Sequence, residues 1–393
     1  IQRRKMDIPI LIGGATTSKL HTAVKLAPHY DGVVCHVSDA SLVVGVCNHL
    51  HDKNKRLSFI TELKNKQQKQ LENFNAKNES LVSLDFARKN SFKVDWQKED
   101  IPQPEDFKLH KFEFSLDEVL PFVDWSPFFW AWELKGKYPA IFNHAKYGEQ
   151  AKELFDDAQG EIAKLKNLKL NTRALFKFWP AGSHADEVQL FNESGKCIEE
   201  MYFLRQQAEK VEGSSYYSLA DFVAPIGYMK QDSLGMFVAT AGDEIEKIAE
   251  DLKNKGDDYR SILLKVIADR LAEATTELLH KKVRAFWQYG KSEDLSVEDL
   301  IAEKYRGIRP APGYPACPDH SEKDKIWQLL QVEKNLNVYL TESKMMTPPS
   351  SVCGFYFSCS QAKYFSVGSL GKDQLVDYAR RKQMKTEEIT KWI

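Results

Sequence analysis

The sequence predicts an α+β fold, in which an antiparallel sheet flanked by helices follows a truncated, doubly wound α/β remnant. Two observations lead to this prediction. At the start of the chain, two short apolar runs alternate with two helical patterns, which is the order of a parallel sheet with crossover helices. After residue 78, runs typical of strands alternate with turn residues and with helical patterns, the longest at 258–289.

The first part of the chain is expected to be the end of a domain. Each apolar run is continuous, as in a strand buried on both faces, and hydroxyl-bearing residues open the first helix. The expected strands and helices are, in order, 8–12, 16–26, 32–37 and 41–50. Four elements are too few to close a core, and the chain does not open with methionine, so we expect a piece of a longer polypeptide. A polar helical pattern at 54–78 then leads into a linker, which places the domains at 1–77 and 78–393.

Several local patterns define elements of the second domain. Ser115-Leu-Asp-Glu118 is a capping-box sequence, and Ser126-Pro127 offers an N-cap followed by proline at the first helical position. Helical spacing groups Leu154, Ala158, Ile162 and Leu165 on one face, and Ile262, Val266, Ala274 and Leu278 on the apolar stripe of the longest helix. The remaining expected elements are strands at 174–179, 187–191, 235–240, 354–358 and 364–367 and a helix at 373–382.

Composition excludes several classes of protein. The 393 residues carry a formal net charge of −1, which gives no electrostatic basis for binding nucleic acid. No apolar run is long enough to cross a bilayer, and no signal peptide precedes the first strand. The six cysteines form no Cys-x-x-Cys pair, so we expect reduced thiols and a cytoplasmic protein.

The segment Arg309–His320 concentrates four prolines around one arginine, one glycine and one tyrosine. Proline fixes its own φ and holds the preceding residue extended, so this segment cannot be helix interior or central strand. It is expected to be a stiff, extended rail, with Gly313 allowing a positive φ or a close backbone approach. Held in this way, Arg309 suits a ligand carboxylate or phosphate. A proline-rich surface loop with an ordinary arginine explains the pattern equally well.

Other candidate motifs indicate structure more than chemistry. Glu277-Leu-Leu-His280, with Glu273 one turn earlier, would need a second such pair to form a di-iron bundle. Asp319-His320 and His49-Leu-His51 are weak metal motifs, so no metal site is expected. No Gly-x-Gly-x-x-Gly follows a strand, which argues against a nucleotide-binding Rossmann methyltransferase.

The proline-rich phrase, with Tyr305-Arg-Gly-Ile308 before it and Ser321-Glu-Lys323 after it, resembles the activation domain of the cobalamin-dependent methionine synthase family. Other phrases agree in order and spacing: Asp124-Trp-Ser-Pro-Phe-Phe129, Arg205-Gln-Gln-Ala-Glu-Lys210, Leu219-Ala-Asp-Phe-Val-Ala-Pro225, Asp269-Arg-Leu-Ala-Glu-Ala274 and Lys363-Tyr-Phe365. The run from Ile8 to Lys19 looks like the end of the same family's cobalamin-binding domain. The resemblance covers essentially the whole chain.

The resemblance implies two sets of cofactor contacts. Those expected for S-adenosylmethionine are Asp124, Arg309, Ala311, Tyr314, Tyr364 and Phe365. Those expected for cobalamin are Gly13, Gly14 and Ala40. We expect Arg309 to pair with the ligand carboxylate, Asp124 to balance a positive group and aromatic faces to hold the sulfonium or adenine. The family's Asp-x-His-x-x-Gly motif, whose histidine ligates cobalt, and the Ser-x-Leu motif expected before Gly13 are both absent.

The resemblance also implies an activity. The family is a methyltransferase, 5-methyltetrahydrofolate–homocysteine methyltransferase, which uses methylcobalamin and carries zinc only in its homocysteine domain. This part is expected to present S-adenosylmethionine for reductive methylation of cob(II)alamin, with flavodoxin or a diflavin methionine synthase reductase as electron donor. The upstream cobalamin, folate and homocysteine domains are its other partners. Positioning dominates such a step, so no catalytic residue is expected, and this part should not turn over alone. A stand-alone S-adenosylmethionine sensor and a purely structural fragment are the alternatives.

Overall fold

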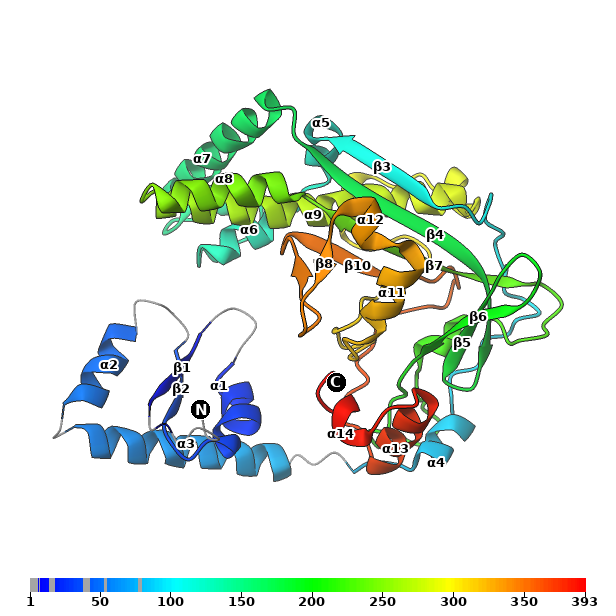
Figure 1. Cartoon of the computed structure of the whole chain (residues 1–393), viewed down its shortest axis with the longest axis horizontal. Coiled ribbons are helices and arrows are strands. Elements are labelled where there is room, and N and C mark those ends of the chain that lie inside the picture. Colours follow the sequence, from blue (N-terminus) through cyan, green and yellow to red (C-terminus); the bar gives the residue numbers. More distant parts are fainter. Residues whose placement is uncertain (1–5, 7, 14–17, 38–42, 53–54, 77–79) are drawn as a thin grey trace. The chain divides into compact units, whose positions relative to one another are not determined.

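The computed structural model describes residues 6, 8–13, 18–37, 43–52, 55–76 and 80–393. By its internal contacts the chain divides into two compact units, Ile1–Ser80 and Leu81–Ile393 (Figure 1). Each unit has its own sheet and helices, and each is described separately below.

The first unit is built on two parallel strands. Strand β1 pairs with β2 so that Ile10 lies opposite Val34, and a helical crossover connects them, as the β-α-β pattern predicts. Helix α3 packs beside this pair, where the side-chain amide of Gln67 donates to the Val34 carbonyl at 2.7 Å. The elements of this unit are β1 (Ile10–Ile12), α1 (Lys19–His21) continuing into a π-helix (Thr22–Leu26) and a 3₁₀ turn (Ala27–His29), β2 (Val34–His36), α2 (Val43–His51) and α3 (Arg56–Ala76).

The second unit is organised by a six-stranded antiparallel sheet. Five of its strands follow the order β10-β7-β4-β5-β6, and the sixth, β3, pairs with β4. Strand β4 is its axis: it pairs with β7 on one side, and with β3 and β5 along different parts of the other. The antiparallel sheet confirms the predicted fold class. The strands are β3 (His110–Ser115), β4 (Asn171–His184), β5 (Glu187–Phe191), β6 (Cys197–Tyr202), β7 (Asp232–Thr240) and β10 (Ser351–Tyr356), with β8 (Tyr339–Leu340) and β9 (Met346–Thr347) forming a separate pair.

Both faces of the sheet are covered, because alternate residues of its central strands enter two different cores. On β7, Phe237 and Ala239 join the core under α9, whereas Met236 and Val238 join the core under α11. This period of two is the expected alternation of a strand. All nine residues of β7 are consequently buried.

Helices close the two faces (Figure 1). The longest, α9, contacts β4, β7 and β10. The helices of this unit are α4 (Leu84–Lys89), α5 (Leu116–Val119), α6 (Ser126–Ala131), α7 (Gly148–Asn167), α8 (Asp243–Asn254), α9 (Asp258–Phe286), α10 (Val297–Ile301), α11 (Glu322–Leu330), α12 (Val332–Leu336), α13 (Lys372–Arg381) and α14 (Thr386–Ile389). The capping box at Ser115 and Glu118 and the buried face of α7 are confirmed.

Three local predictions are wrong. Ser126 is the first residue of α6 and not its cap, because its backbone N–H is bonded by the carboxylate of Asp124 at 2.9 Å. Ile262 does not join the buried stripe of α9: it is 52% exposed. Residues 364–367 form no strand, since the ladder of the sheet ends at β10.

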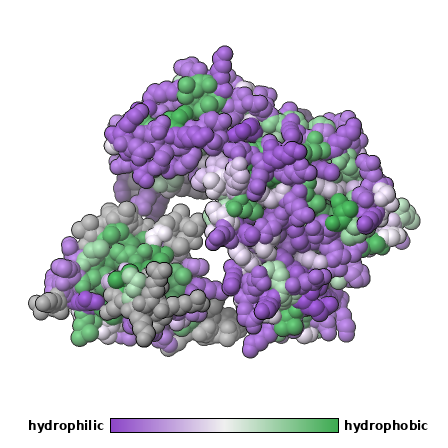
Figure 2. All heavy atoms as spheres, in the orientation of Figure 1, coloured by the Kyte–Doolittle hydropathy of each residue, from purple (hydrophilic) through white to green (hydrophobic). Residues whose placement is uncertain are grey.

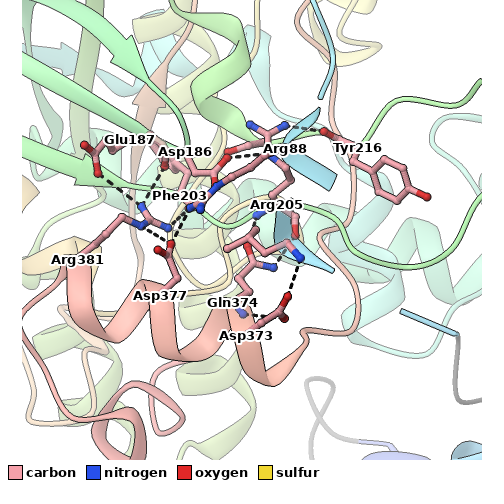
Figure 3. A network of polar contacts seen from close by, with 12 residues as sticks. Arg88, Asp186, Glu187, Phe203, Arg205, Tyr216, Asp373, Gln374, Asp377 and Arg381 are labelled. Carbon is pink, nitrogen blue, oxygen red and sulfur yellow. Dashed lines mark hydrogen bonds and ion pairs between the residues drawn. The ribbon is translucent and has the colours of Figure 1, made fainter. Parts of the chain in front are cut away.

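A buried polar network fastens α13 to the body of this unit (Figure 3). Asp186 accepts from Arg205 at 2.6 Å and from Arg88 at 2.7 Å, and both partners reach it from different segments. Gln374 of α13 pairs with the backbone of Arg205, accepting from its N–H at 2.7 Å and donating to its carbonyl at 2.9 Å. Asp377 of the same helix binds Arg88. Helix α13 is therefore held by hydrogen bonds as well as by the apolar packing of Tyr378 and Ala379.

The surface of the second unit is mostly hydrophilic on the face shown in Figure 2, with scattered apolar patches. Among the described residues, none of the helices has the length and apolar character needed to cross a bilayer. The six cysteines are free thiols, as the sequence predicts.

Candidate ligand-binding cavity

The proline-rich segment runs along the free edge of β10. Ile308 and Phe357 exchange two backbone hydrogen bonds, of 3.1 and 3.0 Å, in antiparallel sense. The Phe355 N–H then donates to the Pro310 carbonyl at 2.9 Å. Proline lacks an N–H and so cannot extend a ladder, but its carbonyl can accept. The segment is neither helix nor strand, as predicted, and it covers the edge that β10 would otherwise expose.

Gly313 turns this segment away from the sheet. Its φ is +92°, its N–H donates to the Cys317 carbonyl at 2.7 Å, and the Cys317 N–H returns to the Tyr314 carbonyl at 2.9 Å. A Cβ at this position would lie 2.3 Å from the His320 ring. Both predicted uses of the glycine, positive φ and close approach, are therefore present.

A cavity of about 600 Å³ opens between this segment, β10, the start of α11 and the 364–365 segment. Of the six residues expected to contact S-adenosylmethionine, five line it together: Arg309, Ala311, Tyr314, Tyr364 and Phe365. Asp124 is not among the described residues that line the cavity, and its carboxylate instead bonds the start of α6. The other lining residues are Phe237, Glu273, Glu303, Pro310, Pro312, Pro315, Ala316, Lys323, Met346, Ser351, Val352 and Cys353.

Arg309 is fixed in the cavity wall by three neighbours. Its Nη2 is ion-paired with the Glu277 carboxylate, and its Nε donates to the Tyr305 hydroxyl at 3.3 Å. Its backbone N–H donates to the Tyr364 hydroxyl at 3.1 Å. Burial opposes the charge of Arg309, but Glu277 and the hydroxyl groups of Tyr305 and Tyr364 together outweigh burial and raise the pKa of the guanidinium. The arginine is therefore a permanent, oriented cation.

The Glu-x-x-His pair of α9 lies directly behind this arginine. Burial raises the pKa of Glu277, and the charge of Arg309 opposes that shift. Burial also lowers the pKa of His280 well below its usual value, so the ring is neutral. His280 stacks on Tyr356 with ring centroids 4.9 Å apart and meets Tyr305 edge-on at 4.5 Å. The pair supports the cavity wall.

The Tyr364-Phe365 segment is positioned by side chains in place of a strand ladder. The side-chain amide of Gln206 donates to the Ser366 carbonyl at 2.7 Å, and the Val367 N–H donates to the Pro315 carbonyl at 2.8 Å. Phe365 packs against Tyr217 with ring centroids 5.7 Å apart. These contacts join the Arg205-Gln-Gln-Ala-Glu-Lys210 phrase of the sequence to the cavity.

Comparison with known proteins agrees with this geometry. Residues 115–383 match the family model described as "Vitamin B12 dependent methionine synthase, activation domain". The chain belongs to this family. A solved structure, the crystal structure of the MetH reactivation domain bound to AdoHcy, is 43% identical to it, with a TM-score of 0.77. The match covers 79% of this chain and 97% of that one.

Membership of the activation-domain family of this methyltransferase confirms the resemblance seen in the sequence. Several residues of the cavity were nevertheless not predicted from sequence as ligand contacts, among them Glu303, Lys323, Met346 and Cys353. Glu303 lies two residues before the Tyr305-Arg-Gly-Ile308 phrase, which is the only local signal for it. Lys323, on α11, ends the Ser321-Glu-Lys323 phrase that follows the proline-rich segment. Met346 and Cys353 reach the cavity from β9 and β10, and no short motif marks them.

Two of the three residues expected to contact cobalamin lie outside the residues that the structure describes. Gly14 and Ala40 are not among the described residues. Gly13 directly follows β1, and a Cβ there would lie 3.2 Å from the Val37 carbonyl oxygen. That close approach already explains the glycine, so its contact with cobalamin stays a prediction. Among the described residues, no three His, Cys, Asp or Glu side chains are grouped as a metal site would need.

Proposed function

We propose that this chain binds S-adenosylmethionine in the cavity beside β10 and serves as the reactivation module of a cobalamin-dependent methionine synthase. The observation that supports the proposal most is the convergence of five predicted contacts from two distant segments, 309–314 and 364–365, on one cavity. The AdoHcy bound in the related solved structure supports the same ligand class.

The charges of the cavity suit this ligand. S-adenosylmethionine carries a carboxylate, an ammonium and a sulfonium beside a purine. Arg309 offers a cation to the carboxylate, while Glu273 and Glu303 offer carboxylates to the two positive groups. Tyr314 and Tyr364 supply aromatic faces, on which a sulfonium or an adenine is favourable. Asp124 remains a proposed contact that the cavity lining does not include.

The chemistry asked of these residues is positioning. The side chains of the wall hold the ligand with its methyl group toward the opening, and no acid–base group has to move a proton. Held by the upstream cobalamin domain, cobalamin would supply a cobalt acceptor for the methyl group, and flavodoxin or a diflavin reductase would supply one electron. S-adenosylhomocysteine is the product that leaves. The electron donor and the cytoplasmic location are part of the proposal.

Calorimetric titration tests the proposal. The purified chain is titrated with S-adenosylmethionine and with S-adenosylhomocysteine, beside Arg309→Ala and the exposed control Arg380→Ala. We expect saturable binding by the parent and the control, and a loss of tenfold or more for Arg309→Ala, about 1.4 kcal/mol. A folded parent that binds neither ligand would refute the proposed function.

A further inference from the structure

Lys323 is a buried cation of the cavity wall without an acidic partner among the described residues. The residue is 6% exposed, and its Nζ donates to the Lys344 carbonyl at 3.0 Å and lies 3.2 Å from Nδ1 of His320. Lys382, equally shielded, shows the usual arrangement, since it bonds Asp319, Ser321 and Glu322. An ammonium group has three N–H donors, so one donor of Lys323 is left for another acceptor.

The environment of Lys323 does not supply that acceptor. Burial lowers the pKa of Lys323, and burial likewise lowers the pKa of His320, so the imidazole is neutral. The nearby thiol of Cys353 is also neutral, because burial raises its pKa to about 12. A buried charge without a counter-charge is unfavourable unless hydrogen bonds satisfy it. Lys323 lines the cavity, so a bound ligand can supply the acceptor.

The register of the proline-rich segment separates Lys323 from Arg309. Ile308 lies opposite Phe357, and the segment runs antiparallel to β10, so Arg309 lies opposite Tyr356. Lys323 lies beside Cys353, three residues back along β10. At about 3.4 Å per residue this is about 10 Å along the strand. The two cations therefore serve opposite ends of the cavity.

The two ends differ in chemistry. Near Arg309 the wall is polar, with the Tyr364 hydroxyl bonded to the arginine and Glu303 two residues before Tyr305. Near Lys323 the wall is mostly apolar: Cys353 lies beside it, and Met346 follows two residues after Lys344, whose carbonyl Lys323 bonds. Ser351 and Val352 precede Cys353 on β10 and also line the cavity. A flat apolar group with hydrogen-bond acceptors on its rim fits this second end.

We propose that Lys323 recognises the purine of the ligand, with its free N–H donating to a ring nitrogen of adenine. The inference rests on the proposed function and adds an orientation to it. The amino-acid part lies at the Arg309 end among the charged groups, and the base lies between the apolar residues with its acceptor edge toward Lys323. Lys323 is then a specificity-determining residue, because a buried donor penalises any base that lacks the acceptor.

The test pairs ligand atoms with side-chain atoms. S-adenosylhomocysteine and its 1-deaza, 3-deaza and 7-deaza analogues are titrated into the parent, into Lys323→Met and into the exposed control Lys334→Met. We expect one analogue to bind the parent and the control at least tenfold more weakly than S-adenosylhomocysteine, and that difference to vanish in Lys323→Met. If Lys323 has a purely structural role, Lys323→Met should weaken the binding of all four ligands equally.

Two results would overturn the inference. If the parent binds all four ligands equally, Lys323 does not donate to a ring nitrogen of the base. This result is obtained with the parent alone. If the weaker binding of a deaza analogue persists in folded Lys323→Met, or in Lys323→Gln where the first variant does not fold, a group other than Lys323 donates to that ring nitrogen. A parent that binds neither S-adenosylmethionine nor S-adenosylhomocysteine instead refutes the proposed function on which the inference rests.

Discussion

Glu277 of α9 and Arg309 of the proline-rich segment form an ion pair in which each side chain is 12% exposed. The pair joins the longest helix of the second unit to the segment that lines the cavity. It also gives the Glu-x-x-His sequence of α9 a role, since the carboxylate orients the guanidinium and the neutral His280 packs behind it. An oriented arginine loses little conformational freedom when a ligand carboxylate arrives.

Removing the charge of Glu277 should destabilise the protein more than it harms ligand binding. Glu277→Gln leaves the Arg309 guanidinium without its counter-charge, and breaking a buried pair in this way costs about 3–5 kcal/mol. A ligand carboxylate restores a counter-charge, so we expect the affinity for S-adenosylhomocysteine to fall less than in Arg309→Ala. Urea unfolding with and without the ligand measures both effects.

The same pair predicts strong non-additivity. In Arg309→Ala the raised pKa of Glu277 lets the lone carboxyl take up a proton, so the double variant should unfold with a free energy close to that of the single variants. Asp95→Asn, which breaks a pair with Lys98 on the surface, is the control and should leave the midpoint unchanged. Additive losses in the double variant would show that the two side chains do not act together.

Much of the fold could be predicted because the strands are covered on both faces or carry a clear period. The exceptions depended on distant contacts. Residues 364–367 have a strand-like composition, but they bond the Gln206 side chain and the Pro315 carbonyl in place of a neighbouring strand. Ile262 is exposed although its neighbours Ser261, Leu263 and Leu264 are buried, so α9 is covered at its start and Ile262 lies on its outer face. Periodicity alone does not fix which edge of an apolar stripe is covered.

The site was predictable only in its local part. Proline geometry indicates a rail at Arg309–His320 and a turn at Gly313, because both follow from φ restrictions of single residues. The partner of Arg309 is 32 residues away on a helix, and Lys323 enters the cavity from α11. Both residues stand in phrases that the sequence singles out, but nothing in sequence spacing fixes how those segments pack, so neither the Glu277–Arg309 ion pair nor the place of Lys323 in the cavity could be predicted.

The network of Figure 3 predicts a large loss of stability when its central cation is removed. Arg205 is buried and bonds both Asp186 and Asp221. Arg205→Met leaves the two carboxylates in a buried site with too few donors, so we expect a loss of about 3–5 kcal/mol in urea unfolding. Arg380→Met, at an exposed position bonded to Asp377, should change stability by less than about 1 kcal/mol. Equal effects of the two variants would contradict a buried network.

Gly313 should tolerate alanine less well than a glycine whose only constraint is φ. Gly195 also has a positive φ, of +78°, but a Cβ there meets nothing within 4 Å. Gly195→Ala should therefore cost about 1–2 kcal/mol from backbone strain alone. Gly313→Ala adds a clash with the His320 ring, so it should cost more and displace the adjacent Tyr314.

Ligand binding separates the two glycine variants further. Because Tyr314 lines the cavity, we expect Gly313→Ala to weaken S-adenosylhomocysteine binding, whereas Gly195→Ala binds as the parent does. Thermal unfolding and calorimetry on the same samples supply both numbers. Unchanged affinity in a folded Gly313→Ala would show that the turn does not set the position of the tyrosine.

Asp232, at the start of β7, should make stability fall as the pH rises from about 4 to about 6. Burial raises the pKa of this carboxyl to about 6, although it accepts the N–H groups of Ala224 at 2.9 Å and Ser233 at 2.7 Å. Glu99 adds to the shift and Arg306 opposes it. Between the unfolded value of 3.8 and the folded value, the native state binds more protons than the unfolded state, so each increment of pH destabilises it. The total is about 2–3 kcal/mol.

Asp232→Asn should remove this slope, so the stability of the variant relative to the parent should rise between about pH 4 and about pH 6. Ala224 and Ser233 donate to different oxygens of the carboxyl, so the amide keeps an acceptor for only one of them, which adds a loss of stability that does not depend on pH. Asp377 provides the control of opposite sign. Burial raises its pKa, but hydrogen bonds with Arg380 and Arg88 outweigh burial and lower the pKa to about 2. The stability that the Asp377 carboxylate contributes is present above the pKa of this group in the unfolded state and is lost as the pH falls toward 2. Asp377→Asn should therefore flatten the stability curve only on its acid side. Urea midpoints measured from pH 3 to pH 8 distinguish the two carboxyls. If the urea midpoint of the parent rises between pH 4 and pH 6, and the midpoint of Asp232→Asn rises with the same slope, the raised pKa of Asp232 is excluded.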